Sequence, residues 1–213
     1  MEARAIRRFR RALGSFCYAV GADALRRGMN LENVDVELLD ESMIDSELDA
    51  RLRAFLCELF PNWKEIFKVR RAWHDAPPEF TALARDRDGE IVGHVAIVER
   101  TISTSWNFRY SVASVQGVSV APPYRKTGLS TRLLDAALEE SRRRGYLFAV
   151  LFCREPLVHF YERNGWKLPN DSMIMWRDRE LAVHMQSNCP MYRELADEPF
   201  PEGPIDVHNP IRP

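Results

Sequence analysis

The segment from Gly117 to Gly145 constrains the fold more than any other part of this 213-residue chain. Its letters, GVSVAPPYRKTGLSTRLLDAALEESRRRG, give in order a short apolar strand, a double proline, a compact turn and an amphipathic helix. A turn that opens a helix presents unpaired backbone N–H groups in one direction, and the helix dipole adds partial positive charge there. The segment therefore predicts a strand–turn–helix unit whose turn binds phosphate.

The residues of the turn suit an anion. Gly128 has no side chain to block close approach of the backbone. Arg125 and Lys126 add positive charge, and the hydroxyls of Thr127 and Ser130 add donors. The spacing fits neither the Walker loop, G-x-x-x-x-G-K-[ST], nor the dinucleotide fingerprint, G-x-G-x-x-G. The turn therefore belongs to another class of phosphate site.

This spacing resembles the acyl-CoA signature of the GNAT superfamily of N-acetyltransferases, V-x-V-x-P-x-x-[RQ]-x-x-G-x-[GA]. The residues that match it in register are Val118, Val120, Pro122, Arg125 and Gly128, and Ser130 replaces the usual Gly or Ala at the last place. The resemblance implies an enzyme whose acyl donor is acetyl-CoA. It assigns donor binding to Val118, Ser119, Val120, Arg125, Lys126, Thr127, Gly128, Leu129 and Ser130, the first three through their main-chain atoms.

A second segment agrees with the first. The apolar run from Tyr146 to Cys153 is typical of a buried strand. The letters that follow Pro156, LVHFYERNGWKL, resemble the short helix of the same family that ends in Y-x-x-x-G-[FW]. In that family the tyrosine protonates the leaving thiolate, so the resemblance implies that Tyr161 is catalytic. The alternative is that Tyr161 is an amphipathic helix residue with its hydroxyl at the surface.

The general base stays open at this point. Some members of the family carry a glutamate on the strand before the phosphate turn, where this chain has Gln116. Glutamine takes no proton, although it can hold a water molecule. Glu99, His94 and His159 lie in the same region, and each also suits a purely structural role. We therefore expect a chain of water molecules to remove the proton from the amine.

Composition excludes several other classes of protein. The longest apolar run is far short of the roughly 20 residues that cross a membrane, and a net charge of −1 gives no basis for binding nucleic acid. The four cysteines are widely separated and the five histidines are not clustered, so we expect no metal site and no disulfide framework. A reducing, cytoplasmic location is the expectation.

The rest of the chain predicts an α/β (α+β) fold. Strands are expected at 33–40, 79–102 as a hairpin with its turn at Asp88–Gly89, 108–120, 167–177 and 180–186, and helices at 46–60 and 62–73. This order matches the GNAT topology. The resemblance implies a central, mixed, mostly antiparallel twisted sheet that is splayed between two central strands, with helices on both faces.

Three parts of the chain are distinguished. Residues 33–187 carry the resemblance and form the expected acyltransferase domain. Residues 1–32 are rich in arginine and suit an accessory helix, a transit peptide or sequence upstream of the domain. Residues 188–213 are rich in proline and are expected to be a tail, either docked or loose.

The acceptor is expected to be a primary amine of a small molecule, amino sugar or aminoglycoside-like. The hairpin letters from Gly93 to Arg100 resemble aminoglycoside 2′-N-acetyltransferases and nodulation N-acyltransferases. A pocket that binds a polycationic acceptor should carry several carboxylates. The candidates are Asp171, Asp178, Glu180, Asp197, Glu198 and Glu202. The alternative is that these residues lie in solvated loops. Two alternatives remain: a longer-chain N-acyltransferase acting on an amino-sugar oligomer, and a non-catalytic acyl-CoA-binding module. Acyl chain length and oligomeric state, a homodimer included, stay open.

Overall fold

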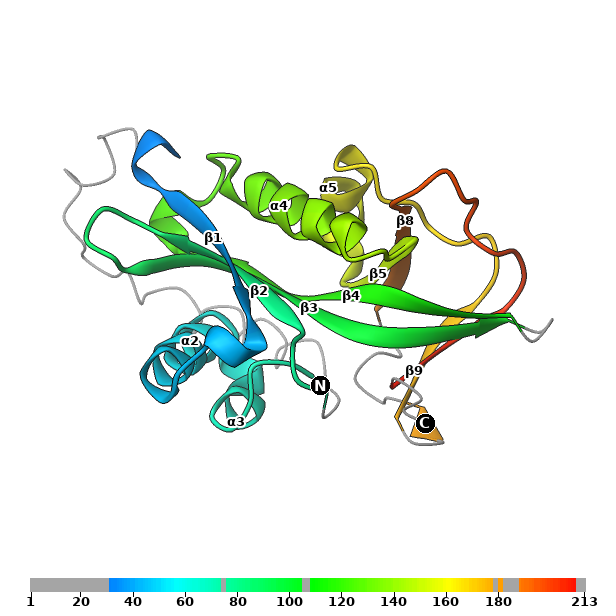
Figure 1. The fold of residues 1–213 in the computed structure, drawn as a ribbon, viewed down its shortest axis with the longest axis horizontal. Helices are drawn as coiled ribbons and strands as arrows, with labels where there is room; N and C mark the ends of the chain where they lie inside the picture. The colour runs from blue at the N-terminus through cyan, green and yellow to red at the C-terminus, as the bar shows by residue number, and fades with distance from the viewer. Residues whose placement is uncertain (1–30, 74–75, 105–107, 178–179, 182–187, 210–213) are drawn as a thin grey trace, which may run out of the picture.

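The computed structural model describes residues 31–73, 76–104, 108–177, 180–181 and 188–209. The expected N-terminal extension therefore lies almost wholly outside the described residues. Within them the chain forms one sheet with helices on both faces (Figure 1). The strands are β1 (Asp35–Asp40), β2 (Phe80–Arg85), β3 (Ile91–Thr104), β4 (Arg109–Val120), β5 (Phe148–Cys153), β6 (Met173–Arg177), β7 (Glu180–Leu181), β8 (Cys189–Glu194) and β9 (Ile205–His208). The helices are α2 (Ser46–Leu59), α3 (Lys64–Phe67), α4 (Leu129–Arg143) and α5 (Val158–Arg163).

The sheet is mixed and mostly antiparallel, as the sequence predicts. The long hairpin of β3 and β4 forms its centre. The other edge of β3 pairs first with β2 and then with β9, so β1 and β2 lie at one end of β3 while β9 and β6 lie at the other. β8 adds to the far edge of β5. The predicted fold class is confirmed.

The two central strands diverge. β4 and β5 run parallel, and the recorded pairs between their described residues are Ala113 with Ala149 and Ser114 with Val150. Beyond these pairs no described strand pairs with β4 on the side of β5 as it continues to Val120. A strand edge of this kind presents free N–H and C=O groups, which a ligand can pair with. The expected splay of the sheet is therefore present.

Helices cover the sheet on both faces (Figure 1). α4 and α5 lie on one face, where the apolar residues of α4 recur at helical spacing and are buried: Leu129, Leu133, Leu134, Ala137 and Leu138. α2 and α3 lie on the other face and bury Leu52, Leu56 and Phe67. The gap between β4 and β5 opens between these two helical layers.

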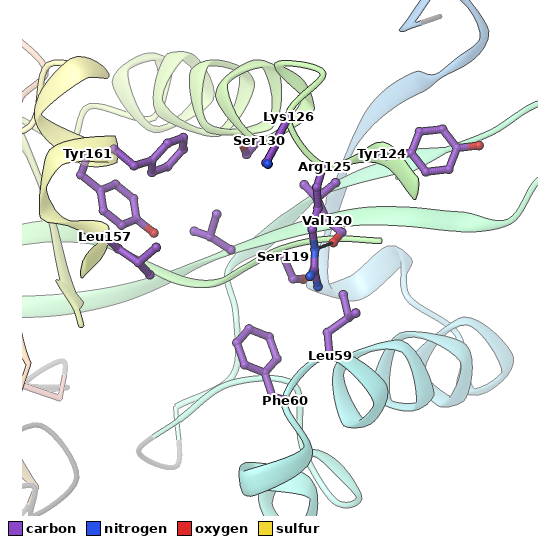
Figure 2. Close-up of a pocket in the computed structure, with 12 residues that line it drawn as sticks. Leu59, Phe60, Ser119, Val120, Tyr124, Arg125, Lys126, Ser130, Leu157 and Tyr161 are labelled. Carbon is purple, nitrogen blue, oxygen red and sulfur yellow. Dashed lines mark hydrogen bonds between the residues drawn. The ribbon is translucent and has the colours of Figure 1, made fainter. Parts of the chain in front are cut away.

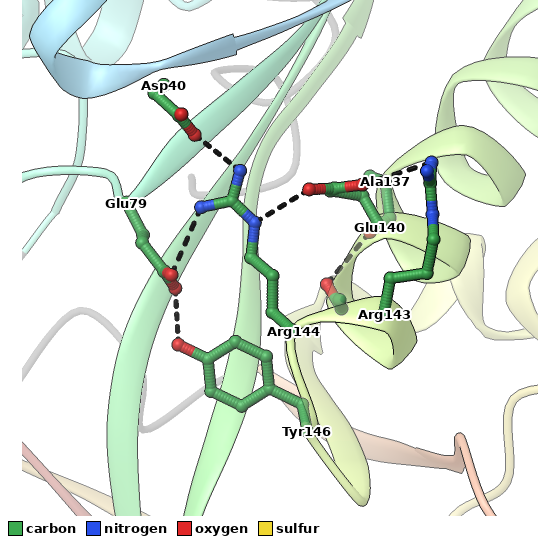
Figure 3. A network of polar contacts seen from close by, with 8 residues as sticks. Asp40, Glu79, Ala137, Glu140, Arg143, Arg144 and Tyr146 are labelled. Atoms are coloured by element: carbon green, nitrogen blue, oxygen red, sulfur yellow. Dashed lines mark hydrogen bonds and ion pairs between the residues drawn. The ribbon is translucent and has the colours of Figure 1, made fainter.

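A polar network fixes the end of α4 against the first strands (Figure 3). The guanidinium of Arg144 bonds to the carboxylates of Asp40, Glu79 and Glu140. The hydroxyl of Tyr146 donates to Glu79 as well. Because Arg144 is half-buried, these bonds are worth more than exposed ion pairs. The network holds the C-terminal end of the helix that begins at the phosphate turn.

The proline-rich segment from residue 188 onward contributes to the sheet. β8 pairs antiparallel with β5, and β9 lies between β3 and β6. The segment is thus docked, and it docks as two strands, which the sequence analysis did not predict. The strand expected at 180–186 is described only at Glu180–Leu181; its other residues lie outside the described part of the chain.

Candidate active site

A β-bulge shapes the end of β4. The pairing register shifts between His94 and Ala96, so that two residues of β4, Gly117 and Val118, face the single residue Val95. Gly117 adopts φ +62°, and a Cβ there would lie 3.0 Å from Cε1 of His94. The ring of His94 hydrogen-bonds to the carbonyl of Gly117, with 2.9 Å between Nδ1 and O. Bulges of this kind turn a strand, and the residues that follow this one, Val118 to Val120, line the first cavity described below.

The predicted phosphate turn follows β4 directly. Gly128 caps α4 in a left-handed conformation, φ +94°, and Lys126 is also left-handed, φ +65°. Besides its backbone hydrogen bonds, two side-chain bonds stabilise the turn: Nε of Arg125 donates to the carbonyl of Val120 at 3.2 Å, and the hydroxyl of Thr127 donates to the carbonyl of Tyr124 at 2.7 Å. The first turn of α4 leaves its N–H groups without intrahelical partners. The turn is therefore preformed around a group of donors.

A cavity of about 430 Å³ lies between this turn, the end of β4 and α5 (Figure 2). Six of the nine predicted donor-binding residues line it: Val118, Ser119, Val120, Arg125, Lys126 and Ser130. Thr127 and Gly128 are not among its lining residues, and the side chain of Leu129 is buried in the core. The sequence analysis did not assign five further lining residues to the site: Leu59 at the end of α2, Phe60 directly after it, Tyr124, Leu157 and Phe160 of α5.

Tyr161 lies at the far end of the same cavity. Its hydroxyl points into the cavity, whereas the hydroxyl of Tyr124 points away and donates to Asp86 at 3.1 Å (Figure 2). The ring of Tyr161 packs edge-on against Phe160 and Trp166. Burial, with a smaller contribution from Cys153, raises the pKa of Tyr161 above its usual value. The phenol therefore keeps its proton at neutral pH, as a proton donor must.

A second cavity, of about 590 Å³, meets the first at Leu59, Phe60, Val118, Leu157 and Tyr161. It extends past the divergent ends of β4 and β5, where Ser114, Gln116 and Phe152 line it, to the segment that follows α2. Its volume lies within the range of about 300–1,000 Å³ that is typical of sites for small molecules. Two cavities thus share Tyr161, one reaching the phosphate turn and the other lying across the gap.

Trp73 is held in the wall of the second cavity by two strands. Its backbone N–H donates to the side-chain oxygen of Gln116 at 2.9 Å, and its carbonyl accepts from Nη2 of Arg100 at 3.1 Å. Its ring packs edge-on against Phe60 and Phe67, with ring centroids 5.7 and 4.8 Å away. Gln116, which the sequence analysis matched to a glutamate of some family members, therefore contacts and holds the wall of the cavity.

None of the three base candidates from the sequence lines either cavity. His94 is fully buried, and this burial lowers its pKa to about 4. Glu99 is exposed and accepts a hydrogen bond from Ser111. His159 is exposed beside Glu162, with 3.7 Å between its Nδ1 and the carboxylate. The arrangement leaves the water route as the expectation.

The described residues contain no group of three or more His, Cys, Asp or Glu side chains arranged to hold a metal ion. They also contain no helix that is both long and apolar enough to cross a bilayer.

Comparisons with known proteins agree with this geometry. A family profile described as an acetyltransferase (GNAT) domain matches residues 35–168. Similar solved structures include the Escherichia coli GNAT family N-acetyltransferase YhbS in complex with CoA, with a TM-score of 0.56, 18% identity and coverage of 82% of this chain and 88% of that one. Escherichia coli ElaA gives a TM-score of 0.55 and 16% identity, covering 76% of this chain and 99% of that one. An aminoglycoside 6′-N-acetyltransferase complexed with coenzyme A gives a TM-score of 0.52 and 14% identity, covering 78% of this chain and 99% of that one.

At these identities the solved structures establish the fold, while the profile spans well over half of the chain. The splayed sheet, the phosphate turn and the profile match together identify the chain as a member of the GNAT superfamily of acetyltransferases, enzymes whose acyl donor is acetyl-CoA.

Proposed function

We propose that this enzyme transfers the acetyl group of acetyl-CoA directly to a primary amine of a small molecule, with an amino sugar as the first candidate. One observation carries the proposal: the two cavities meet at Tyr161, beside the gap between β4 and β5. A donor in the first cavity and an acceptor in the second therefore reach one hydroxyl from two sides. Such convergence supplies the proximity that direct transfer needs.

The first cavity supports donor binding along its whole length. The free edge of β4 at Val118 to Val120 offers main-chain groups to the amides of pantetheine. The turn from Arg125 to Ser130 offers the first N–H groups of α4, and two cations, to the pyrophosphate. This placement brings the thioester between Val118 and Tyr161.

The reaction then needs few groups. The amine nitrogen attacks the thioester carbonyl carbon, and a backbone N–H near Val118 stabilises the developing oxyanion. The carbon–sulfur bond breaks as Tyr161 gives its proton to the departing thiolate. The proton lost by the amine leaves through water and restores the phenol in turn, since no histidine or carboxylate among the described residues lines the two cavities.

The acceptor cavity favours an amino sugar over an aminoglycoside. Asp171, Asp197, Glu198 and Glu202 are among the carboxylates that would meet a polycation, and none of them lines either cavity. Asp178 and the side chain of Glu180 lie outside the part of the chain that the structure describes. Aromatic walls suit the apolar faces of sugar rings.

A second candidate function is supported by the apolar part of the first cavity. Leu59, Phe60, Leu157 and Phe160 line it near Tyr161 and suit a longer acyl chain. Burying such a chain gains about 0.8 kcal/mol per methylene. The enzyme would then be a longer-chain N-acyltransferase acting on an amino-sugar oligomer.

One experiment decides between an acetyltransferase, a longer-chain acyltransferase and a non-catalytic acyl-CoA-binding module. Acyl-CoA donors of increasing chain length are tested against a panel of amines, with release of free CoA thiol as the readout. We expect acetyl-CoA to give the highest kcat/KM. A steady rise toward long chains would establish the longer-chain enzyme instead, and binding of acetyl-CoA without turnover on any amine would establish the non-catalytic module.

A cytoplasmic location accompanies this proposal. The described cysteines, Cys57, Cys153 and Cys189, are all free thiols. Free thiols persist in reducing compartments.

A further inference from the structure

The charge of the acceptor cavity is positive. Among its described lining residues, Arg154 is the one with a charged side chain, and no aspartate or glutamate is present. Arg154 follows the last residue of β5 directly and is exposed. No hydrogen bond or ion pair joins its guanidinium to another described side chain, whereas Arg71 and Arg144 each bond to at least two carboxylates. The guanidinium of Arg154 is thus available to a ligand.

Much of the remaining wall of this cavity is aromatic. Phe60, Trp63, Trp73 and Phe152 line it together with the apolar Met175, and polar groups come from Asn62, Ser114, Gln116 and Asn188. The backbone of Trp73 is held by hydrogen bonds at both its N–H and its C=O, and its ring packs edge-on against Phe60 and Phe67, so the residue is a fixed part of the wall. Fixed aromatic walls bind the faces of rings and apolar chains. The cavity therefore combines a surface for a ring with a single cation at its edge.

An arginine in this position selects among amines. The N–H groups of its guanidinium can donate two parallel hydrogen bonds to one carboxylate or phosphate. Its charge repels a second ammonium on the acceptor, and it also favours the neutral form of a nearby reacting amine. The first effect disfavours polycationic acceptors. The second acts in the direction that the reaction needs, because only the neutral amine attacks the thioester.

We propose that the acceptor is a primary amine on a ring or apolar body that also carries an anionic oxygen group, and that Arg154 binds this group. The proposal rests on the acetyl-transfer function proposed above and makes Arg154 a determinant of acceptor specificity. A carboxylate and a phosphate present the same chemistry to the guanidinium, so both sources are tested.

The test compares acceptors in matched pairs. One pair is glucosamine 6-phosphate with glucosamine, and the other is phenylalanine with phenylethylamine; kanamycin serves as a polycation. The rate of thiol release from acetyl-CoA gives kcat/KM for each. We expect the anionic member of at least one pair to exceed its partner by roughly 10-fold or more, the effect of one charged hydrogen bond. The pair that shows the difference identifies the anion.

Two variants assign the effect to its residue. Arg154→Gln is expected to reduce kcat/KM for the preferred anionic acceptor by roughly 10-fold or more, so that the ratio within the pair approaches one. Arg163→Gln is the matched control, because Arg163 is an exposed arginine on the adjacent helix α5 and lines neither cavity. It should keep the wild-type ratio, and both variants should bind acetyl-CoA as the wild type does.

The outcomes separate the two proposals. Acetylation of uncharged amines or kanamycin in preference to the anionic acceptors would overturn the role of Arg154 and leave acetyl transfer intact. An anion preference that survives in Arg154→Gln would also overturn it. If the wild type binds acetyl-CoA but acetylates none of the amines, the acetyl-transfer function itself fails, and the specificity proposal fails with it.

Discussion

The side-chain oxygen of Gln116 accepts a hydrogen bond from the backbone N–H of Trp73, 2.9 Å away, and so joins the central strand β4 to the wall of the acceptor cavity. Gln116→Leu removes the acceptor and leaves a partly buried N–H group unpaired. We expect a loss of about 1 kcal/mol in the free energy of unfolding, measured by urea denaturation. We also expect a higher KM for the amine, because Trp73 is less firmly placed.

Gln116→Glu is the companion variant, since a carboxylate also accepts the bond from Trp73. Its acceptor KM should stay closer to the wild-type value than that of Gln116→Leu. Equal KM values in the wild type and the Leu variant would show that the bond does not position the cavity wall.

The phosphate turn is tested by a pair of glycines. Gly128 and Gly145 both have left-handed backbones, φ +94° and +90°, at opposite ends of α4. A Cβ at Gly128 meets only Cδ1 of Leu31, 3.9 Å away, and one at Gly145 meets nothing within 4 Å. Substitution by Ala should therefore cost similar stability at both sites, through the same backbone strain.

Their effects on the donor should differ. Gly128→Asp is expected to weaken acetyl-CoA binding strongly in calorimetry, because it places a side chain and a negative charge at the pyrophosphate. Gly145→Asp should bind acetyl-CoA normally. Arg125→Ala should have a smaller effect than Gly128→Asp, because backbone donors dominate such sites. Unchanged affinity in Gly128→Asp would remove the turn from the donor site.

Tyr161→Phe is expected to lower kcat by about 10², the usual effect of losing a general acid. Its affinity for acetyl-CoA should stay nearly unchanged, since the phenol acts only during the reaction. Tyr124→Phe is the control: Tyr124 lines the same cavity, but its hydroxyl is bonded to Asp86. A kcat equal to that of the wild type in Tyr161→Phe would make this tyrosine a packing residue.

The burial of His94 predicts how the free energy of unfolding depends on pH. Burial lowers its pKa in the folded protein from 6.5 to about 4. The unfolded chain therefore binds a proton below pH 6.5 that the folded protein does not, and stability falls as the pH decreases from 6.5 toward 4. The full loss is about 3 kcal/mol.

Urea denaturation at a series of pH values measures this effect. His94→Gln should show a smaller decrease in stability over that range than the wild type, because it has no group that titrates there. A wild-type profile that is flat between pH 7 and pH 5 would show that His94 is not held neutral in the folded state.

Local sequence signals predicted much of the fold. The α2 helix was expected from Ser46, and the structure adds Asp45, whose side chain accepts from the N–H of Leu48. The hairpin of β2 and β3 turns at Asp88–Gly89 as expected, with Gly89 in the left-handed conformation. These elements are specified by residues that are near one another in the chain.

Strand β8 shows why other elements were missed. Pro190 within it argues against a strand, because proline lacks an N–H. Yet Tyr192, two residues later, directs its N–H and C=O to Lys167, away from β5. Residues two apart in a strand point their backbone groups to the same side. The nitrogen of Pro190 therefore faces away from β5, and the pairing with β5 loses no bond.

The candidate site was predicted to a similar extent. The motif residues near Val120 and Arg125 are contiguous in the chain, and the structure places six of them around one cavity. Leu59, Trp73 and Arg154 come from distant elements and carry no motif, so only the folded sheet brings them together.

The narrow junction between β4 and β5 has a mechanical consequence. Among the described strands, β5 and β8 join the rest of the sheet by backbone pairing at two residue pairs alone, while the buried side chains of β5 pack into the shared core. A donor that pairs with β4 and packs against α5 adds contacts across this junction and stabilises it. Amide hydrogens in β5 and β8 should therefore exchange more slowly once CoA is bound.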